Sequence, residues 1–462
     1  MAALRFVRAI LLPVLQLCAA ASPDALHFSL SPPSTTRTLS LLRGVDRGPL
    51  CSSLNASIAG PLLSSGTSLI RTHDAGVLDW CVVFPNVTAD PNDPSNYDWS
   101  GGDQYFDEIV SSGFTPYIRL GVSWSYPSKA CLTPNVTTFT TVSVAMLRRY
   151  NGRCSGCLRF VEIWNEPDEI RFWNSSSADF YSLFEATARA VRAFNATLKI
   201  GGPGVAFPLS EDSNFSFGLL DFVAARNVPL DFFSWHTYGN ISAAWGHNTS
   251  HLYFDTIVAL REAFAARGLS RLAQHVTEWQ PIILGDAVVT NSAEAAAFTA
   301  SALSIMATAP DVEVSVFYPG CEGVGPNASW GLFLDFGNST MAWRRESYAW
   351  LLVGTLLRDT PFEIVVTASP SLPTASVLAG SNADGTKVNA VVSARAMNAS
   401  QIIVSVPFGG SSARVEILIL DDDSPTAGRA SNMTVPVENG LARVTVDVIS
   451  WPAVISVNVS VL

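Results

Sequence analysis

Short apolar runs alternate with longer segments of helical period from about residue 40 to residue 320. Each run is typical of a buried strand, and the segments between them are typical of amphipathic helices. The segment 176–194 illustrates the helical pattern, with Ser177 as its expected cap. Its apolar face comprises Phe180, Phe184, Thr187, Val191 and Phe194. The predicted strands are 40–46, 68–74, 116–123, 160–166, 199–205, 232–238, 274–279 and 313–319.

Strands that alternate with helices over this length predict an α/β protein with a (β/α)8 TIM barrel. A doubly wound open sheet is the competing fold, but no G-x-G-x-x-G follows the first strand. The pattern changes after about residue 356, where apolar residues recur every second position between turns. This period predicts a small antiparallel β-sandwich over 356–462, behind a barrel domain over 22–355. Residues 26–31 precede the barrel and could add a strand to the sandwich.

The first residues have the character of an export signal. Residues 1–21 carry two arginines, then an apolar stretch, then small residues, which predicts a secretory signal peptide. No later stretch has the ~20 apolar residues of a spanning helix, so we expect no membrane anchor. The expected destination is extracellular or lysosome-like.

The glycosylation sequons and the low fraction of charged residues agree with export through the secretory pathway. The chain has only 15% charged residues and a formal net charge of −11, with no basic cluster, so a nucleic-acid partner is not expected. N-glycans are expected to supply surface solvation that the sparse charges do not. The N-x-[ST] sequons are at Asn55, Asn86, Asn135, Asn174, Asn195, Asn214, Asn240, Asn248, Asn327, Asn338, Asn398, Asn432 and Asn458.

Six of the seven cysteines follow the signal segment. Cys154 and Cys157 form a C-x-x-C motif without a second pair at zinc spacing, which favours a structural disulfide over a metal or redox site. We therefore expect no metal and no cofactor. The other four cysteines follow predicted strands 1, 2, 3 and 8, so they belong to the face of the barrel where the strands end. Any further bridges are expected to join Cys51, Cys81, Cys131 and Cys321 to one another, with Cys51–Cys81 as the most accessible pair.

Polar residues gather at the carboxyl ends of the predicted strands, where barrel enzymes place their active sites. Strand 4 ends in "WNEP" at 164–167, and strand 7 contains a second glutamate. Two carboxylates from different strands suit glycoside hydrolysis, in which one is a protonated acid and the other an ionised nucleophile or base. The candidate site residues are Arg71, His73, Asn165, Glu166, His236, Tyr238, Glu278 and Trp279, and Asp74 is a further polar residue at the end of strand 2.

Six stretches in the right order resemble glycoside hydrolase family 39, which contains β-xylosidases and α-L-iduronidases. They are "LIRTHD", "YDWSGGDQYFDEIVSSGFTPYI", "VEIWNEPD", "LKIGGPG", "VPLDFFSWHTYG" and "HVTEW". The resemblance implies a retaining barrel glycosidase with a glycan substrate. In this chain it implies that Glu166 is the acid/base, that Glu278 is the nucleophile, and that Asn165 binds the sugar 2-hydroxyl.

The resemblance also implies roles for the neighbouring residues. Arg71 and Tyr238 would hold Glu278 ionised, and His236 would line the sugar site. Several alternatives stay open: an Arg71–Asp74 ion pair, a core hydrogen bond for His73, and rim packing rather than sugar stacking for Trp124, Trp279 and Trp330. Two further sets are expected to be solvated or structural: Asp79, Glu162 and Glu169, and the arginines Arg344 and Arg345 at a helix start.

The residues that follow His236 in the sixth predicted strand indicate which type of sugar the site binds. Iduronidases of the family place basic residues there, whereas this chain has Thr237 and Tyr238, closer to the xylosidases. The strand-8 end, "FYPGCEGVG", departs from the xylosidases. We therefore expect a β-xylosidase-like exo-glycosidase acting on a neutral sugar. The alternatives are a uronic-acid glycosidase, an endo-acting relative, and a carbohydrate-binding protein without catalysis.

Overall fold

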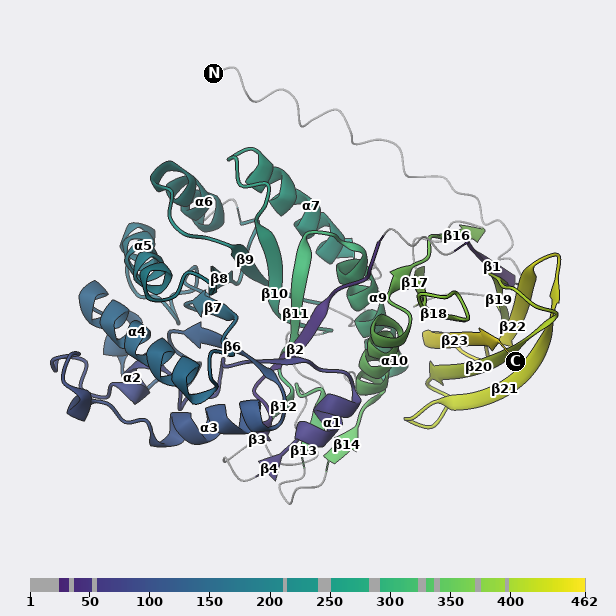
Figure 1. Ribbon diagram of the computed structural model, residues 1–462, viewed down its shortest axis with the longest axis horizontal. Helices are drawn as coiled ribbons and strands as arrows, with labels where there is room; N and C mark the ends of the chain where they lie inside the picture. Colours follow the sequence, from purple (N-terminus) through teal and green to yellow (C-terminus); the bar gives the residue numbers. More distant parts are fainter. Residues whose placement is uncertain are drawn as a thin grey trace.

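The computed structural model describes residues 25–32, 37–51, 56–210, 214–239, 251–281, 291–322, 330–335, 341–369, 375–394 and 399–461. Within them, eight parallel strands close into a barrel in the order β10-β11-β2-β5-β6-β7-β8-β9, which confirms the predicted (β/α)8 fold (Figure 1). All eight predicted strands are present. Their bounds are β2 Leu42–Asp46, β5 Leu69–Arg71, β6 Thr115–Leu120, β7 Phe160–Ile163, β8 Lys199–Val205, β9 Phe232–Tyr238, β10 Ala273–Gln280 and β11 Val312–Phe317.

The barrel interior is built in layers. Its lower layer is an apolar cluster of inward-pointing side chains: Leu69, Tyr117, Phe160, Phe232, Val314 and Val316. Two residues further along the strands, the same inward face carries charge, because side chains of a strand alternate between its two faces. Arg71 follows Leu69 in this way, and Glu162 follows Phe160; both are completely buried. The charged layer therefore lies directly below the strand ends.

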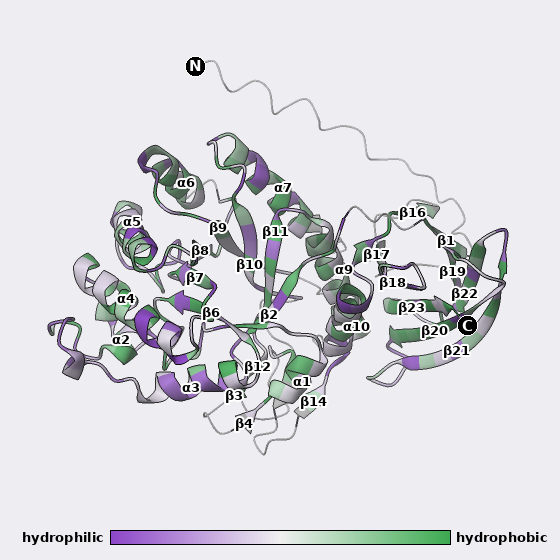
Figure 2. Cartoon of the chain, in the orientation of Figure 1, coloured by the Kyte–Doolittle hydropathy of each residue, from purple (hydrophilic) through white to green (hydrophobic). Residues whose placement is uncertain are grey.

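Helices surround the barrel, and Figure 2 shows hydrophilic segments on α3 and α5 at its outer surface. The cap of α5 is Ser176 rather than Ser177, because Ser176 and Asp179 form a reciprocal capping box. The helices are α1 Ala59–Ser64, α2 Trp80–Val83, α3 Ser100–Ser111, α4 Val136–Arg153, α5 Ser177–Phe194, α6 Phe215–Arg226, α7 His251–Ala265, α9 Ala293–Thr308 and α10 Arg345–Asp359, with short 3-10 turns at Pro94–Asn96 and Lys129–Leu132.

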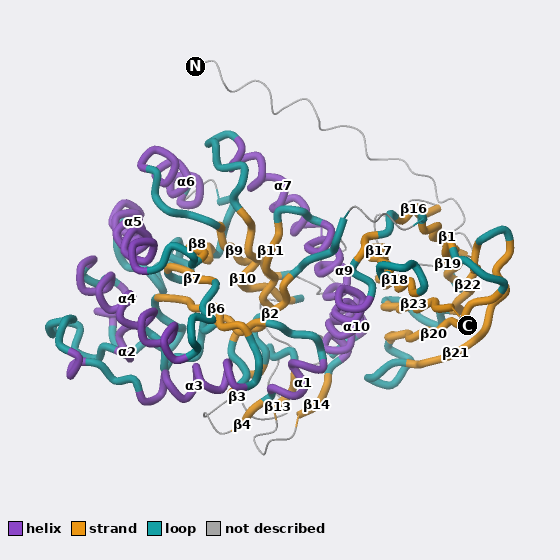
Figure 3. Tube along the Cα trace, in the orientation of Figure 1, coloured by secondary structure: helices purple, strands orange, loops and turns teal. Residues whose placement is uncertain are grey.

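A second sheet of ten strands follows the barrel (Figure 3), in the order β15-β17-β18-β23-β20-β21-β22-β19-β1-β16. It is antiparallel except where β1 runs parallel to β19. Strand β1, Ala25–Leu30, thus joins the start of the chain to this sheet. The other strands are β15 Phe362–Glu363, β16 Val366–Ser369, β17 Ala375–Ser381, β18 Lys387–Ala394, β19 Gln401–Pro407, β20 Ser412–Asp421, β21 Arg429–Glu438, β22 Leu441–Asp447 and β23 Ala453–Val461.

Helices α9 and α10 join the two parts of the molecule (Figure 1). Helix α9 is buried on almost every side, as a helix packed between two layers must be. The boundary expected near residue 356 falls within α10. Arg345 does not lie at a solvated helix start, because it donates hydrogen bonds to the carbonyls of Asn291, Asp421 and Ser424 and so links the two parts. Arg344 is also buried, so the expectation of solvation was wrong for both arginines.

Five short strands lie in the loops at the strand ends of the barrel: β3 Leu50–Cys51, β4 Ala56–Ser57, β12 Cys321–Glu322, β13 Phe333–Asp335 and β14 Met341–Trp343. The predicted signal peptide lies outside the described residues. In the part of the chain that is described, no helix has the length and apolar character needed to cross a membrane.

The disulfides follow the predicted division between the two faces of the barrel. Cys154 pairs with Cys157, as expected. The expectation of a Cys51–Cys81 bridge was wrong, because Cys81 pairs with Cys131 at a Cα–Cα distance of 5.8 Å. Helix α2 begins one residue before Cys81, and the short turn 129–132 after β6 packs beside it, which brings these two loops within bonding range.

Candidate active site

Glu166 follows β7 on an irregular segment of backbone. The strand ends at Ile163, and both Trp164 and Glu166 take positive φ values, 81° and 45°. The Glu166 amide donates to the carbonyl of Gly204, which fixes this segment against the end of β8. Pro167 then prevents the strand from continuing. These features turn the Glu166 side chain over the mouth of the barrel, where 13% of it is exposed.

Glu278 lies across the mouth on β10 and is almost completely buried. Its Oε1 accepts from Arg71 Nη1 at 3.0 Å, and its Oε2 accepts from the Tyr238 hydroxyl at 2.6 Å. Burial and neighbouring carboxylates raise the pKa of Tyr238 well above its ordinary value, so the phenol keeps its proton and remains a donor. Two donors therefore stabilise the ionised form of Glu278.

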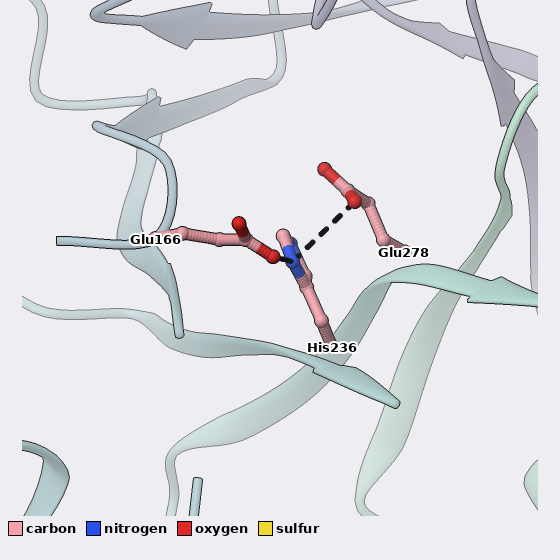
Figure 4. A group of neighbouring side chains, drawn as sticks. All are labelled: Glu166, His236 and Glu278. Carbon is pink, nitrogen blue, oxygen red and sulfur yellow. Dashed lines mark hydrogen bonds and ion pairs between the residues drawn. The ribbon is translucent and has the colours of Figure 1, made fainter. Parts of the chain in front are cut away.

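His236 lies between the two carboxyl groups (Figure 4). Its Nδ1 is 2.8 Å from Glu166 Oε1 and 3.5 Å from Glu278 Oε2. The oxygen of Glu166, the nitrogen of His236 and the oxygen of Glu278 all lie within 4.8 Å of one another. Burial lowers the pKa of His236, which favours a neutral imidazole. Such a cluster could in principle hold a cation, but the Arg71 guanidinium beside Glu278 opposes a second positive charge there.

Arg71 is the centre of the charged layer and is completely buried. Its Nε donates to Glu162 at 2.6 Å, its Nη1 to Asp46 as well as to Glu278, and its Nη2 to Asn165 Oδ1 at 2.7 Å. One guanidinium thus orients four side chains from three strands, because Glu162 lies on β7 and Asn165 lies just after it. Burial raises the pKa of Asp46 well above its ordinary value, which reduces the negative charge around Arg71.

The two candidate catalytic carboxyls have different surroundings. Burial, and secondarily the charge of Asp168, raises the pKa of Glu166 to about 8. Burial also raises the pKa of Glu278, but His236, Arg71 and the Tyr238 hydroxyl act in the opposite direction. Glu166 makes no hydrogen bond to a cationic side chain in the described part of the chain, whereas Glu278 has Arg71. When the pair shares one proton, we therefore assign that proton to Glu166.

Seven of the eight site residues expected from the sequence meet at this place. His73 is among them, because its Nε2 lies 3.3 Å from Glu278 Oε1. Trp279 is the exception, and the expectation that it contacts substrate was wrong. Because Glu278 points into the barrel, its neighbour points outwards; Trp279 is completely buried and its Nε1 donates to Ser315.

Geometry excludes one of the open alternatives, the Arg71–Asp74 ion pair. Arg71 pairs with Asp46, Glu162 and Glu278 and not with Asp74, which instead accepts from the Tyr318 hydroxyl and the Trp124 amide. Trp124 lies at the rim, 56% exposed. Trp330 packs edge-on against Tyr318.

Sequence reasoning missed four residues of this site. Glu162 was set aside as solvated or structural, and Asp46, Asp168 and Tyr318 were not considered. The missed signal for Asp46 and Glu162 was alternation: each lies on the inward face of its strand, which places it in the charged layer. Asp168 gave no comparable signal, since its role in binding the loop after β8 depends on tertiary structure.

Several buried polar atoms of the site have no partner among the described residues. They include Asn165 Nδ2, His73 Nδ1, His236 Nε2 and Glu162 Oε1. Unpaired buried polar atoms are costly, so a cluster of them suggests a place for hydroxyl groups or water. Asn165 Nδ2 is an unpaired donor on the residue before Glu166, and Asn165 Oδ1 accepts from Arg71, which also binds Glu278.

The backbone of Gly204 lies close to the side chains of His236, Arg71 and Glu162, and a side chain at this position would contact them. Gly204 has a φ of +63°, and a Cβ at this position would lie 3.0 Å from His236 Nε2 and 3.3 Å from Arg71 Nη2 and Glu162 Oε1. We expect Gly204→Ala to lower kcat about 10- to 100-fold, because a methyl group displaces His236 and the Arg71 network by a fraction of an ångström. Steady-state kinetics on an aryl glycoside measures the loss.

Gly385→Ala is the matched control for that variant. Gly385 has a similar φ of +69°, but nothing lies within 4 Å of the added Cβ. Both variants carry the same left-handed backbone strain of about 1 kcal/mol. An equal kcat for the two variants would show that the methyl contact at Gly204 does not matter.

Comparisons with known proteins agree with this geometry. Residues 64–307 match the family described as glycosyl hydrolases family 39. The β-xylosidase of Geobacillus stearothermophilus is 38% identical over 78 residues, which is 17% of this chain and 15% of that protein. The α-L-iduronidase of Homo sapiens is 27% identical over 202 residues, which is 40% of this chain and 30% of that protein. The chain thus matches less than a third of the length of either relative.

Solved structures show the same fold over nearly the whole chain. A glucosidase from Croceicoccus marinus superposes with a TM-score of 0.76 at 20% identity, covering 95% of this chain and 99% of the other. A monomeric β-xylosidase from Caulobacter crescentus CB15 gives a TM-score of 0.72 at 16% identity, covering 95% and 100%.

A closed (β/α)8 barrel with two glutamates facing each other over its strand ends defines the class of barrel glycosidases. The chain belongs to glycosyl hydrolases family 39.

Proposed function

We propose that the protein is a retaining exo-glycosidase of the secretory pathway that removes a neutral sugar such as β-linked xylose from a glycan. The observation that carries the proposal is the short distance between the two carboxyl groups: one oxygen of Glu166 and one oxygen of Glu278 lie within 4.8 Å of each other. Retaining enzymes place these groups about 5–5.5 Å apart, whereas inverting enzymes need about 6.5–9.5 Å to admit a water.

In the first step Glu278 attacks the anomeric carbon while Glu166 donates its proton to the glycosidic oxygen. The bond from the anomeric carbon to that oxygen breaks, the aglycone leaves as an alcohol, and the sugar is held as an ester of Glu278. The raised pKa of Glu166, about 8, keeps its proton available at neutral pH. The Arg71 and Tyr238 donors hold Glu278 ready to attack.

In the second step Glu166 acts as the base. Esterification removes the negative charge of Glu278, and the deprotonated Glu166 takes a proton from a water that attacks the anomeric carbon. The ester bond then breaks and both carboxyl groups regain their starting states. His236 Nδ1, at 2.8 Å from Glu166, orients this carboxyl group through both steps.

The residues at the end of β9 favour a neutral sugar as the substrate. After His236 come Thr237 and Tyr238, neither of which carries a positive charge that could meet a uronic carboxylate. The Arg71 guanidinium is committed to protein carboxylates and Asn165. Asn165 Nδ2 and His73 Nδ1 are free to bind hydroxyl groups instead.

The secretory part of the proposal rests on the N-terminal sequence, the sequons and the disulfides. Asn86, Asn135, Asn174, Asn214 and Asn432 are all exposed, as N-glycan attachment requires. Cys81–Cys131 and Cys154–Cys157 are typical of an oxidising compartment. Extracellular and lysosome-like destinations are both consistent with these features.

A panel of aryl glycosides tests the activity. We expect turnover of the β-xyloside, little turnover of the α-L-iduronide, and a first-formed product with the same anomeric configuration as the substrate, followed by NMR. An inverted product would refute the double displacement. Preference for the iduronide would assign a uronic-acid glycosidase, cleavage restricted to the interior of polymers would assign an endo-acting enzyme, and binding without turnover would leave a carbohydrate-binding protein.

A further inference from the structure

Three exposed apolar side chains flank the loop that carries Glu166. Trp124, Ile170 and Phe207 are 56%, 67% and 55% exposed, and they follow the neighbouring strands β6, β7 and β8. Exposed large apolar side chains that gather beside a reaction centre are typical of a binding surface. We call these three residues, together with Arg171, the rim surface.

Hydrogen bonds to carboxylates fix the backbone of this rim surface. The Asp168 carboxylate accepts from the amides of Ala206 and Phe207, at 3.0 and 2.8 Å. The Trp124 amide donates to Asp74 Oδ1 at 2.9 Å. The indole of Trp124 also packs edge-on against the buried ring of Phe172, with centroids 5.9 Å apart. The rim surface is therefore preformed, although its side chains face solvent.

Arg171 adds a positive charge to this surface. Its guanidinium carbon lies over the ring of Trp124, 4.7 Å from the ring centroid, which is a cation–π contact. Its one ion pair in the described part of the chain is long, 3.5 Å from Nη2 to Glu169 Oε2. The Arg171 side chain is 58% exposed, so its guanidinium is accessible to a ligand in solvent.

The reaction determines what this surface meets. Glu166 protonates the glycosidic oxygen, so the leaving group must lie on the Glu166 side of the bond. The loop 166–171 places Arg171 five residues after Glu166, and the charge of Arg171 is close enough to lower the pKa of Glu166 against the larger effect of burial. Arg171 is therefore near the leaving group and not near the sugar that Glu278 holds.

We propose that the rim surface is a leaving-group subsite that favours a carboxylate-bearing aglycone, such as a uronosyl residue, with Arg171 as its specificity-determining residue. The inference rests on the proposed glycosidase function. The preferred substrate then has a neutral sugar on the Glu278 side of the glycosidic bond and an acidic group on the Glu166 side. The planar donors of Arg171 suit a carboxylate, and the apolar neighbours suit a sugar face.

Paired substrates test the proposal on the full-length protein. They share the sugar that the enzyme cleaves and differ only in the aryl leaving group, 4-carboxyphenyl against 4-carbamoylphenyl. We expect Arg171→Gln to lower the kcat/KM ratio of acid to amide about two- to fivefold relative to wild type, chiefly through KM. Comparing this ratio between variants cancels the difference in intrinsic reactivity of the two leaving groups.

Three further variants distinguish charge recognition from general disturbance. Arg171→Lys should restore part of the preference, because it keeps the charge but not the planar donors. Glu169→Gln should strengthen the preference, because it removes the competing carboxylate. Arg226→Gln should leave the ratio unchanged: Arg226 also lies over an aromatic ring, Phe222, and pairs with a glutamate, but it ends α6 on the opposite face of the barrel.

An unchanged acid-to-amide ratio in Arg171→Gln would overturn the inference while leaving the glycosidase function intact. Added salt should reduce the wild-type preference, since the Arg171 side chain is exposed. If the wild-type enzyme cleaves neither substrate with any sugar of the panel, the proposed function fails and the inference fails with it.

Discussion

Glu278→Ala is expected to lower kcat by about four to six orders of magnitude on every substrate, whatever its leaving group. Without this carboxylate no covalent ester can form at the position that Glu278 occupies across from Glu166. The fold should survive, because Arg71 keeps its bonds to Glu162, Asp46 and Asn165. Steady-state kinetics measures the loss, and thermal unfolding verifies that the variant is folded.

Azide provides a positive test of the same assignment. The alanine leaves space on the Glu278 side of the sugar, so azide should restore turnover of an activated aryl glycoside and yield a glycosyl azide of inverted configuration. Glu346→Ala is the matched control, since Glu346 is also a buried glutamate whose pKa is raised to about 8, but it lies on α10 outside the site. Residual activity of Glu278→Ala above about 1% of wild type would contradict the nucleophile assignment.

The barrel and most of the site could be predicted because both depend on short-range patterns. Eight apolar runs separated by helical segments are sufficient to predict a barrel, and a barrel fixes which ends of the strands converge. Residues at those ends, such as Glu166, His236 and Glu278, must therefore lie close together even though they are far apart in the chain. The resemblance to a family supplied roles but was not needed for their proximity.

The errors share a physical cause, which is that a side chain's direction depends on alternation within the barrel. Trp279 was expected beside the sugar because it follows Glu278, yet adjacent residues of a strand point to opposite faces. Glu162 was dismissed for the complementary reason: an acidic residue within an apolar strand was not counted as inward-facing. Alternation from Phe160 along β7 places Glu162 on the inward face, and alternation from Glu278 along β10 places Trp279 on the outward face.

Other features could not be predicted from local pattern at all. The sequence indicates that residues 26–31 could add a strand to the second domain, but not that this strand, β1, pairs in parallel with β19. The Cys81–Cys131 bridge depends on how α2 and the turn 129–132 are oriented, and a strand map gives only the face on which they lie. The positive φ values at Trp164 and Glu166 are likewise imposed by tertiary contacts, such as the bond from the Glu166 amide to Gly204.

Glu166→Ala is expected to separate substrates by their leaving groups. A phenoxide with strong electron-withdrawing substituents departs without protonation, so the first step should be nearly unaffected for a dinitrophenyl glycoside. A glycoside with an alkyl or sugar aglycone needs the proton and should lose about 10²- to 10⁴-fold in kcat/KM. The second step lacks its base in this variant, so the ester should accumulate and appear as a burst in rapid-mixing experiments.

The dependence of kcat/KM on pH also tests Glu166, and the direction of the expected change follows from its raised pKa. Glu166 must be protonated to act in the first step, and burial raises its pKa to about 8. Wild-type kcat/KM on unactivated substrates should therefore hold through neutral pH and fall as the pH rises through about 8, because the protonated fraction falls. In Glu166→Ala this alkaline limb should be absent for the dinitrophenyl substrate, since no ionising acid remains. An unchanged alkaline limb in the variant, or equal losses on activated and unactivated substrates, would assign the proton donor to another residue.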